Sequence, residues 1–318
     1  MNKIFIGPLI GEYGGVPQHI NNIINFSKYH FNPIIPNKLC VRYSSNRIKN
    51  LYVSLLKKFN IFYSDIYGIA ISRVVFPNSK IVHLHGHPYW PEVFLKPAKR
   101  KAKYIHTVHQ IYFKEDCYTS REWDMKKRLN ELMYNSCKKS DVVISVAKWQ
   151  QSFLKKVGIE SVYIPNSIDI KKIECANPNN FREKYIFYDD FIVFPGDIRR
   201  NKRPDLFIEL AKKMPDKKFI MIGNGIFREN IINFLKIEIP KNVLCLGPLP
   251  NKLVLDIFSA ARVFVLTSKN ETFSIALIEA MSCKKAIVAA NNAGPKEIID
   301  DGIDGFLFEP DNIDSLYE

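Results

Sequence analysis

The stretch VFVLTSKNETFSIALIEAM, residues 263 to 281, decides the fold of this chain. It opens with VFVLTS, an apolar run with the length and composition of a buried strand. It closes with an apolar run that holds two glutamates, Glu271 and Glu279, eight residues apart. On one helix, eight residues rotate about 800°, which would leave the two carboxylates about 80° apart. A helix that begins near Ser274 is simpler, and it makes the stretch a strand, a loop and a helix.

This arrangement predicts a site for an elongated anion. Glu271 then lies in the loop at the carboxyl edge of the sheet, where ligands of open α/β sheets bind. Phe273, Ser274 and Ile275 offer backbone N–H groups at the helix N-terminus, which favours phosphate. Glu279 lies about 7 Å further along the helix. The two acids can therefore meet hydroxyl groups on either side of a diphosphate, which is the layout of a nucleotide sugar.

Short apolar runs alternate with amphipathic segments along the whole chain, which predicts βα units and parallel sheets. Strands are expected at 3–7, 80–86, 103–109, 141–146 and 161–165, and again at 191–196, 218–223, 243–247, 263–268 and 285–290. The fold class is therefore α/β, with two doubly wound parallel-sheet domains over residues 1–168 and 169–318. The segment 166–180 shows no clear periodicity and is interpreted as the linker.

The composition is that of a globular chain of 318 residues, 47% hydrophobic and 25% charged. The N-terminal run MNKIFIGPLI is too short for a signal peptide, and no apolar run reaches the length of a membrane span. Six cysteines are scattered without a CxxC pair. A reduced, cytoplasmic chain without a zinc site is expected.

The net charge of +14 is unevenly distributed. Residues 1–168 carry 25 Lys and Arg against 10 Asp and Glu, whereas residues 169–318 carry 21 against 22. The basic clusters at 96–103 and 126–128 favour an anionic partner such as a membrane surface, a phosphorylated acceptor or nucleic acid. A lysine-rich genome is the alternative, but such a bias would enrich both halves alike. No nucleic-acid-binding motif is present, so nucleic acid is not expected as a partner.

A glycine pair precedes the first expected helix, in the sequence IGPLIGEYGGVPQHI. Gly14 and Gly15 allow the backbone to approach a ligand closely, and Pro17 suits the first helical turn. The sequence is not GxGxxG, so a dinucleotide site is not predicted. A tight turn without a ligand remains the alternative for this signal.

Histidines gather at the ends of two expected strands. His83, His85 and His87 alternate along one strand and share a face while it lasts. They could bind a metal ion, but the sequence lacks a carboxylate ligand pattern, so satisfied polar groups at a strand end are favoured. On the next strand, His109 is predicted to face the ligand-binding edge and His106 to be structural.

Four cations follow the first strand of the second half, in the sequence FPGDIRRNKRPDL. Arg199, Arg200, Lys202 and Arg203 all lie within seven residues after Gly196. Arginine chelates phosphate oxygens and lysine acts as a point charge, so the cluster favours a diphosphate. A solvated basic loop is the alternative for some of the four.

These motifs resemble, in order and over nearly the whole chain, the family-four retaining glycosyltransferases of GT-B architecture. The most specific segments are E-x7-E, here ETFSIALIE, and the following GPKEIIDDGIDGFLF. GGVPQHI resembles the first glycine loop of the family, TVHQIY its histidine strand, and SDVVISVAKW and IPNSID the segments that lead to its linker. The resemblance implies two Rossmann-like domains that face each other across a cleft holding a nucleotide-sugar donor.

The resemblance also implies roles for single residues. Glu279 would bind the nucleotide ribose, and Glu271 would contact the sugar hydroxyls and stabilise an oxocarbenium-like transition state. His109 would approach the transferred sugar. The diphosphate would be held by Lys202, an arginine such as Arg199, and the amides of Gly15, Phe273, Ser274 and Ile275. No metal or other cofactor is expected, because cations and helix dipoles neutralise the leaving group.

The implied activity is transfer of a sugar, with retention of configuration, to a lipid-linked or cell-surface glycan precursor. The basic first half would dock on anionic lipid or a polyprenyl-linked acceptor at the cytoplasmic face of a membrane. Two departures leave alternatives open: Asp197 stands where the family has Arg, and the chain ends at Glu318, before the C-terminal helices usual in the family. A non-catalytic nucleotide-sugar-binding protein is one alternative. Another GT-B activity, such as a sugar-nucleotide epimerase or a phosphorylase, is the other, and E-x7-E argues against it.

Overall fold

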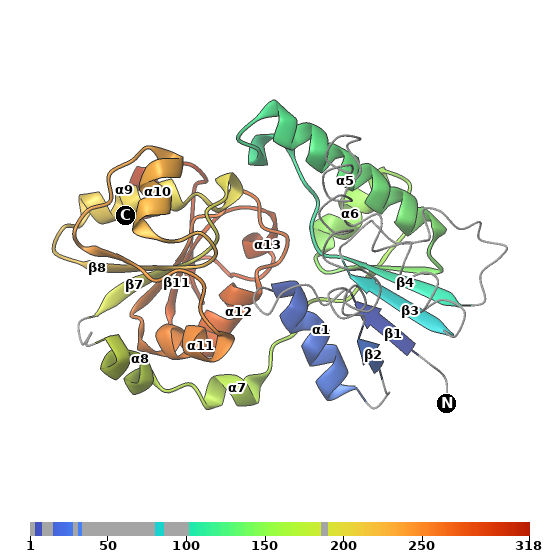
Figure 1. The fold of residues 1–318 in the computed structure, drawn as a ribbon, viewed down its shortest axis with the longest axis horizontal. Coiled ribbons are helices and arrows are strands. Elements are labelled where there is room, and N and C mark those ends of the chain that lie inside the picture. The colour runs from blue at the N-terminus through green and yellow to red at the C-terminus, as the bar shows by residue number, and fades with distance from the viewer. Residues whose placement is uncertain (1–3, 8–14, 28–30, 34–79, 86–101, 186–189) are drawn as a thin grey trace, which may run out of the picture. The chain divides into compact units, whose positions relative to one another are not determined.

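A computed structural model of the chain describes residues 4–7, 15–27, 31–33, 80–85, 102–185 and 190–318 (Figure 1). The chain divides into two compact units. The first comprises residues 1–112 and 123–165, and the second comprises residues 113–122 and 166–318. The main boundary thus lies at 165/166, close to the predicted 168/169. The sequence did not indicate that the short segment 113–122 belongs to the second unit.

The first unit is built on a parallel sheet with the strand order β2-β1-β3-β4-β5-β6. Its strands are β1 (Ile4–Gly7), β2 (Phe31–Pro33), β3 (Ile81–His85), β4 (Lys103–Val108), β5 (Val142–Ser145) and β6 (Val162–Tyr163). Its helices are α1 (Gly15–Phe26), most of α5 (Ser120–Lys139) and α6 (Lys148–Lys156). Val82, Leu84 and Tyr104 are buried in β3 and β4, as expected for strands of a parallel sheet that is covered on both faces.

The second unit contains a second parallel sheet, in the order β12-β11-β10-β7-β8-β9. Its strands are β7 (Phe191–Pro195), β8 (Lys218–Ile222), β9 (Val243–Cys245), β10 (Val263–Leu266), β11 (Ala286–Ala290) and β12 (Phe306–Phe308). Its helices are η4 (Lys114–Asp116), α7 (Ile170–Glu174), α8 (Pro178–Tyr185), η5 (Arg200–Lys202), α9 (Pro204–Lys213), α10 (Arg228–Leu235), α11 (Asn251–Ala260), α12 (Ile275–Ser282), α13 (Ala293–Lys296) and α14 (Ile313–Tyr317).

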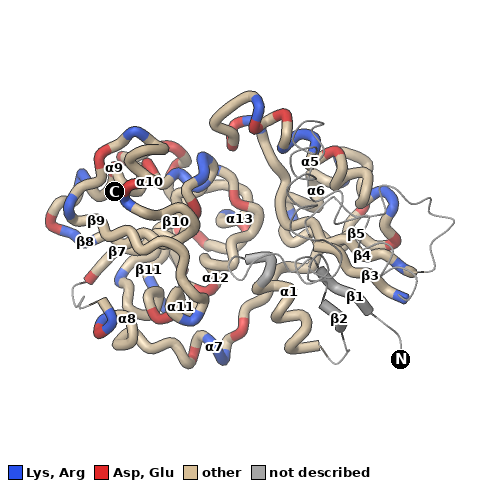
Figure 2. Tube along the Cα trace, in the orientation of Figure 1, with Lys and Arg blue, Asp and Glu red and all other residues tan. Residues whose placement is uncertain are grey.

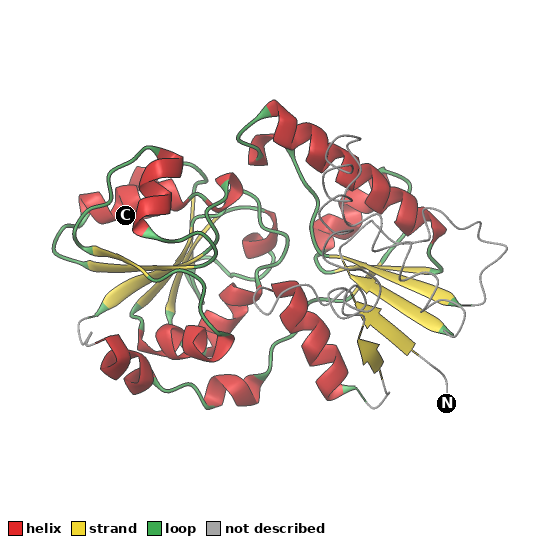
Figure 3. Cartoon of the chain, viewed as in Figure 1, coloured by secondary structure: helices red, strands yellow, loops and turns green. Residues whose placement is uncertain are grey.

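Helices cover both faces of this second sheet (Figure 3). Side chains alternate along β8: Ile220 and Ile222 pack into one hydrophobic core with α8, α11 and α12. Phe219 and Met221 pack into the other core with α9 and α10. Because both faces of such a strand are buried, the sequence is a continuous apolar run rather than an alternating one. The predicted α/β class with two doubly wound parallel-sheet domains is confirmed.

Several short elements differ from the sequence prediction. The presumed linker contains α7, which is capped by Asp169, and the start of α8. In α8, Phe181 is fully buried among the side chains of the second unit, so this segment is part of the core rather than a free connection. Strands β2 and β12 were also not predicted; each has three residues, too few to show a period. Among the described residues, no helix is both long and apolar enough to cross a membrane.

Candidate functional site

Two loops of the second unit bring Lys202 and Glu271 together. They leave the carboxyl ends of β7 and β10, which are neighbouring parallel strands, so both emerge at the same edge of the sheet. The Nζ atom of Lys202 lies 2.5 Å from Oε2 of Glu271. The two side chains are only 22% and 15% exposed. The sequence predicted Lys202 for the diphosphate and Glu271 for the sugar, but it did not predict that they form an ion pair.

Hydrogen bonds to backbone carbonyl groups hold these two loops together. Oγ1 of Thr267 lies 2.8 Å from the carbonyl oxygen of Lys202 and 2.9 Å from that of Arg203, so its hydroxyl group donates to this turn. The N–H of Lys269 donates to the carbonyl of Asn201 at 2.7 Å. The end of β10 therefore fixes the position of η5, the short helix that carries Lys202.

Helix α12 begins at Ile275 with Ser274 as its N-cap residue, which confirms the predicted start of the helix. Phe273 and Ile275 are buried. Ser274 has φ 71° and ψ 91°, a backbone conformation that residues other than glycine rarely adopt. The amides of the first turn have no acceptor within the helix and carry the positive end of its dipole. This geometry suits an anion, and the diphosphate seat at Phe273, Ser274 and Ile275 stays a prediction.

Glu279 lies one turn further along α12 and is buried, with 4% of its surface exposed. Its Oε1 accepts a hydrogen bond from Nδ2 of Asn251 at 3.2 Å. Asn251 is the first residue of α11 and directly follows the sequence GPLP at residues 247–250. The sequence did not point to Asn251, because its contact with Glu279 joins residues too distant in sequence to show a pattern.

Two glycines allow backbones to cross closely at this edge. The N–H of Gly294, at the start of α13, donates to the carbonyl of Glu271 at 3.0 Å. A Cβ atom on Gly294 would lie 2.6 Å from that carbonyl oxygen. A Cβ atom on Gly223 would lie 2.1 Å from the carbonyl oxygen of Gly196. The segment GPKE, residues 294–297, therefore supports the loop that carries Glu271 through Gly294.

The predicted basic cluster divides into separate contacts. Arg199 pairs with Asp197 at 3.1 Å and its side chain is 55% exposed. Asp197 also accepts hydrogen bonds from the backbone and side chain of Asn224. Asp197, which departs from the family pattern, thus joins the loops after β7 and β8. The prediction that Arg199 holds a diphosphate stays a prediction.

The other two arginines of the cluster, Arg200 and Arg203, contact groups of this same chain. Arg203 forms ion pairs with Asp205 and Asp311. Arg200 donates from Nη1 to the carbonyl of Cys117 at 2.7 Å. Both contacts are local to the second unit. Arg203 is partly buried in its ion pairs, whereas Arg200 is exposed to solvent, so the solvated basic loop still describes Arg200.

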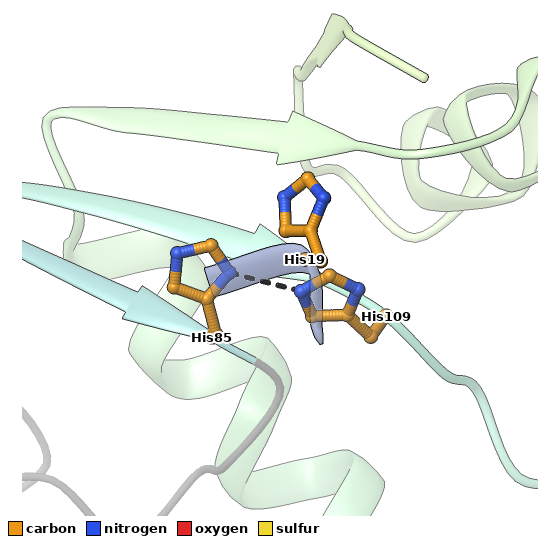
Figure 4. A group of neighbouring side chains, drawn as sticks. All are labelled: His19, His85 and His109. Carbon is orange, nitrogen blue, oxygen red and sulfur yellow. Dashed lines mark hydrogen bonds between the residues drawn. The ribbon is translucent and has the colours of Figure 1, made fainter. Parts of the chain in front are cut away.

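The first unit holds a cluster of histidines from three elements (Figure 4). His19 lies on α1, His85 is the last residue of β3, and His109 directly follows β4. Nδ1 of His85 lies 2.9 Å from Nε2 of His109, within hydrogen-bonding distance. The ring centroid of His19 lies 5.4 Å from that of His85 and 5.1 Å from that of His109. One ring nitrogen of each residue lies within 4.8 Å of the others.

Burial keeps most of these imidazoles uncharged. It lowers the pKa of His19 to about 4. Burial, assisted by the neighbouring His19 and His106, lowers the pKa of His83 to about 3. The pKa of the fully buried His85 is also well below its usual range, mainly because of burial. Neutral imidazoles can hydrogen-bond to a sugar hydroxyl or bind a metal ion, and in this cluster His85 and His109 already engage each other.

The remaining predictions for the first unit have mixed outcomes. His106 is buried and its Nδ1 lies 3.0 Å from the hydroxyl of Ser136, as expected for a structural residue. His109 is half-buried at the carboxyl end of β4. Gly15 is the first residue of α1. His87 and Gly14 lie outside the described residues.

The charges of the second unit are mixed in sign, with Lys and Arg interspersed among Asp and Glu (Figure 2). In the first unit, the basic cluster 126–128 lies on α5, where Lys127 and Arg128 are exposed. Most of the other cluster, 96–103, lies outside the described residues. The structure therefore places one of the two basic clusters on a helix surface.

Two family models match the chain in succession. Glycosyltransferase Family 4 matches residues 50–172, and Glycosyl transferases group 1 matches residues 178–318. The chain belongs to the family-four glycosyltransferases. The resemblance stated from the motifs is thereby confirmed, and with it the GT-B class of fold.

Known relatives in this family match either nearly the whole chain or about half of it. An uncharacterized glycosyltransferase of Methanocaldococcus jannaschii is 22% identical over 98% of this chain and 86% of its own length. The UDP-Gal:alpha-D-GlcNAc-diphosphoundecaprenol alpha-1,3-galactosyltransferase of Escherichia coli is 30% identical over 51% of this chain and 46% of its own length. Among solved structures, Anabaena HepE in complex with UDP and glucose is similar with a TM-score of 0.71 at 17% identity, covering 100% of this chain and 88% of HepE.

Proposed function

We propose that this glycosyltransferase moves a sugar from a nucleotide-diphosphate sugar to an acceptor with retention of anomeric configuration and without a metal ion. The observation that carries the proposal is the contact between Lys202 and Glu271, one loop before the N-terminus of α12. A cation, a carboxylate and a helix N-terminus thus lie together at one edge of a parallel sheet. The structural relative HepE was solved with UDP and glucose, which supports a nucleotide-sugar donor.

In this proposal each group acts on one part of the donor. The diphosphate competes with Glu271 for Lys202 and also receives the amides of Phe273, Ser274 and Ile275. Preorganised N–H groups and a cation stabilise the charge that develops on the leaving diphosphate, so no metal is required for that purpose. Glu279 accepts hydrogen bonds from the ribose hydroxyls.

The sugar lies at the other end of the donor. Glu271, released from Lys202, accepts from the sugar hydroxyls and stabilises positive charge at the anomeric carbon. His109 is proposed to contact the transferred sugar, and Arg199 and Gly15 are proposed to bind the diphosphate. The acceptor attacks on the face that the diphosphate leaves, which gives retention.

We further propose a lipid-linked acceptor at the cytoplasmic face of a membrane. The support is the excess of 15 positive charges in residues 1–168 and the name of the Escherichia coli relative, which specifies a diphosphoundecaprenol acceptor. Positive charge is attracted to anionic lipid and to a diphosphate alike.

The test compares the two glutamates. Glu279→Gln is expected to weaken binding of the nucleoside diphosphate about tenfold, because a charged acceptor for two hydroxyls is lost. Glu271→Gln is expected to lower turnover about 100-fold with a smaller effect on nucleotide binding, because its charge acts mainly in the transition state. Calorimetry with UDP, GDP and ADP measures binding. Release of nucleoside diphosphate with and without acceptor, in the presence of a chelator, measures turnover.

Glu209→Gln is the matched control, since Glu209 is exposed on α9 of the same unit. Equal activity of all three variants would show that the site is misassigned. Nucleotide binding without any transfer or slow donor hydrolysis would instead support a non-catalytic binding protein. The anomeric configuration of the first product, read by proton NMR before mutarotation, tests retention.

A further inference from the structure

Residues 113–122, here called the clamp segment, belong to the second unit although the chain on either side of them belongs to the first. The segment contains η4 and the first residues of α5. It contributes none of the residues that the proposed function uses, yet it touches both loops that carry them.

One contact reaches the loop of Glu271. Oδ1 of Asp116 accepts a hydrogen bond from Nδ2 of Asn270 at 2.6 Å, and Asn270 directly precedes Glu271. Asp116 is only 3% exposed. A buried carboxylate requires hydrogen-bond donors, and Asn270 supplies one of them, so this contact ties the loop of Glu271 to the clamp segment.

The second contact reaches the loop of Lys202. Nη1 of Arg200 donates to the carbonyl of Cys117 at 2.7 Å, and its guanidinium lies 5.9 Å from the ring centroid of Tyr118. Arg200 is the first residue of η5 and Lys202 is the last. A single ten-residue segment thus binds the residue adjacent to Glu271 and a residue two positions from Lys202.

We infer that the clamp segment holds the two loops of the donor site at the separation that brings Lys202 and Glu271 into contact. Asp116 and Arg200 are positioning residues in this inference: they act on the loops and do not touch the donor. The inference rests on the proposed function, since it assigns a role to the spacing between two proposed donor-site residues. A displacement of about 1 Å in such a spacing lowers turnover by about 100-fold in unfavourable cases.

The test uses Asp116→Ala and Asp116→Asn with Glu115→Ala as the control, because Glu115 is the exposed neighbour of Asp116 in η4. Asp116→Ala is expected to lower kcat at least tenfold while the affinity for nucleoside diphosphate changes less than twofold. Asp116→Asn keeps an oxygen that can accept from Asn270, so it is expected to recover most of the turnover. If Asp116 only stabilised the fold and did not position the loops, its replacement would not lower kcat while leaving nucleotide binding unchanged.

Asn270→Ala removes the same hydrogen bond from the other side and keeps the test valid if Asp116→Ala does not fold. It is expected to lower kcat to a similar extent. The Asp116→Ala, Asn270→Ala double variant is expected to be less than twofold slower than either single variant, because the two substitutions remove the same hydrogen bond. Independent effects that multiply in the double variant would overturn the inference.

Hydrogen exchange of the apo protein separates this inference from the proposed function. Asp116→Ala is expected to speed exchange in residues 197–203 and 267–275 at least fivefold, with exchange in β8 unchanged. Exchange in both loops equal to that of Glu115→Ala would overturn the inference, whether or not the protein transfers sugar. Faster exchange in the loops of a protein that shows no transfer would leave the clamp standing and refute the proposed activity.

Discussion

At the residue scale, Ser274 adopts a backbone conformation that is unfavourable for any residue with a side chain. Ser274 has a positive φ at the N-terminus of α12, where the predicted diphosphate seat lies. Residues held in sparsely populated backbone regions cost about 1–3 kcal/mol and gather at functional sites. The conformation turns the chain sharply between the loop of Glu271 and the helix of Glu279, so it separates the two acids into different elements.

Ser274→Gly is therefore expected to stabilise the second unit by about 0.5–1 kcal/mol. Glycine relieves the strained φ, and the greater freedom of the unfolded chain offsets part of that gain. Hydrogen exchange of core amides in β7, β8 and β10 measures the effect. Ser274→Ala, which keeps the strain, is the control, and a glycine variant no more stable than the alanine variant contradicts the prediction.

The histidine cluster predicts a loss of stability in mild acid. The pKa of His19 is lowered to about 4 by burial, and the values of His83 and His85 are lowered as well. Between pH 6.5 and about 4 the unfolded chain binds protons that the folded first unit does not, so stability falls as the pH is lowered through this window. Each such group contributes about 1.4 kcal/mol per pH unit.

Urea denaturation followed by tryptophan fluorescence measures this loss, because Trp123 and Trp149 lie in the first unit. His19→Gln is expected to reduce the slope of stability against pH by about one proton. The rings of His85 and His109 lie 5.4 and 5.1 Å from that of His19. All seven histidines precede residue 169, so the second unit serves as an internal control, read by hydrogen exchange of core amides in β8 and β10. An equal slope there would refute the assignment.

At the scale of elements, long apolar runs and helix starts were predictable, and contacts between distant loops were not. The run VFVLTS predicted β10 because a buried parallel strand is apolar at every position, and the break at Ser274 predicted the start of α12. The ion pair of Lys202 with Glu271 joins residues on two separate βα units. Its existence depends on β7 and β10 being neighbours, a strand order that periodicity does not encode. The same holds for Asn251 against Glu279.

Helix α13 supports the Glu271 loop through Gly294, which leads to a further prediction. A Cβ atom on Gly294 would meet the backbone of Glu271 and Thr272 at 2.6 to 2.8 Å. Backbone cannot yield as a flexible side chain does, so Gly294→Ala is expected to displace the loop, destabilise the second unit by about 1–3 kcal/mol and lower turnover at least tenfold. Steady-state kinetics and hydrogen exchange in β10 measure the two effects.

Gly302→Ala is the matched control for Gly294→Ala. Gly302 has φ 76° but no atom within 4 Å of an added Cβ, so alanine is expected to cost about 1 kcal/mol through backbone strain alone. Its turnover is expected to stay unchanged. Equal losses of turnover in the two variants would show that lower stability, rather than displacement of the Glu271 loop, explains the effect.

At the scale of the whole molecule, positive charge and the proposed donor site belong to different parts of the sequence. Residues 1–168 carry a net +15 and residues 169–318 a net −1. The second unit holds Lys202, Glu271 and Glu279. A division of labour in which the first unit meets an anionic acceptor surface and the second binds the donor follows from this distribution as a proposal.

Vesicle binding tests that division. The protein is expected to bind vesicles containing phosphatidylglycerol but not neutral phosphatidylcholine vesicles, with binding that weakens as salt is raised. Each basic residue near an anionic surface contributes about 1 kcal/mol, so replacing Lys126, Lys127 and Arg128 with Gln is expected to weaken binding at least tenfold. The control replaces Lys212, Lys218 and Lys241, three exposed lysines of the second unit. If both triple variants lose affinity equally, binding follows total charge, and the first unit has no special role in meeting the acceptor surface.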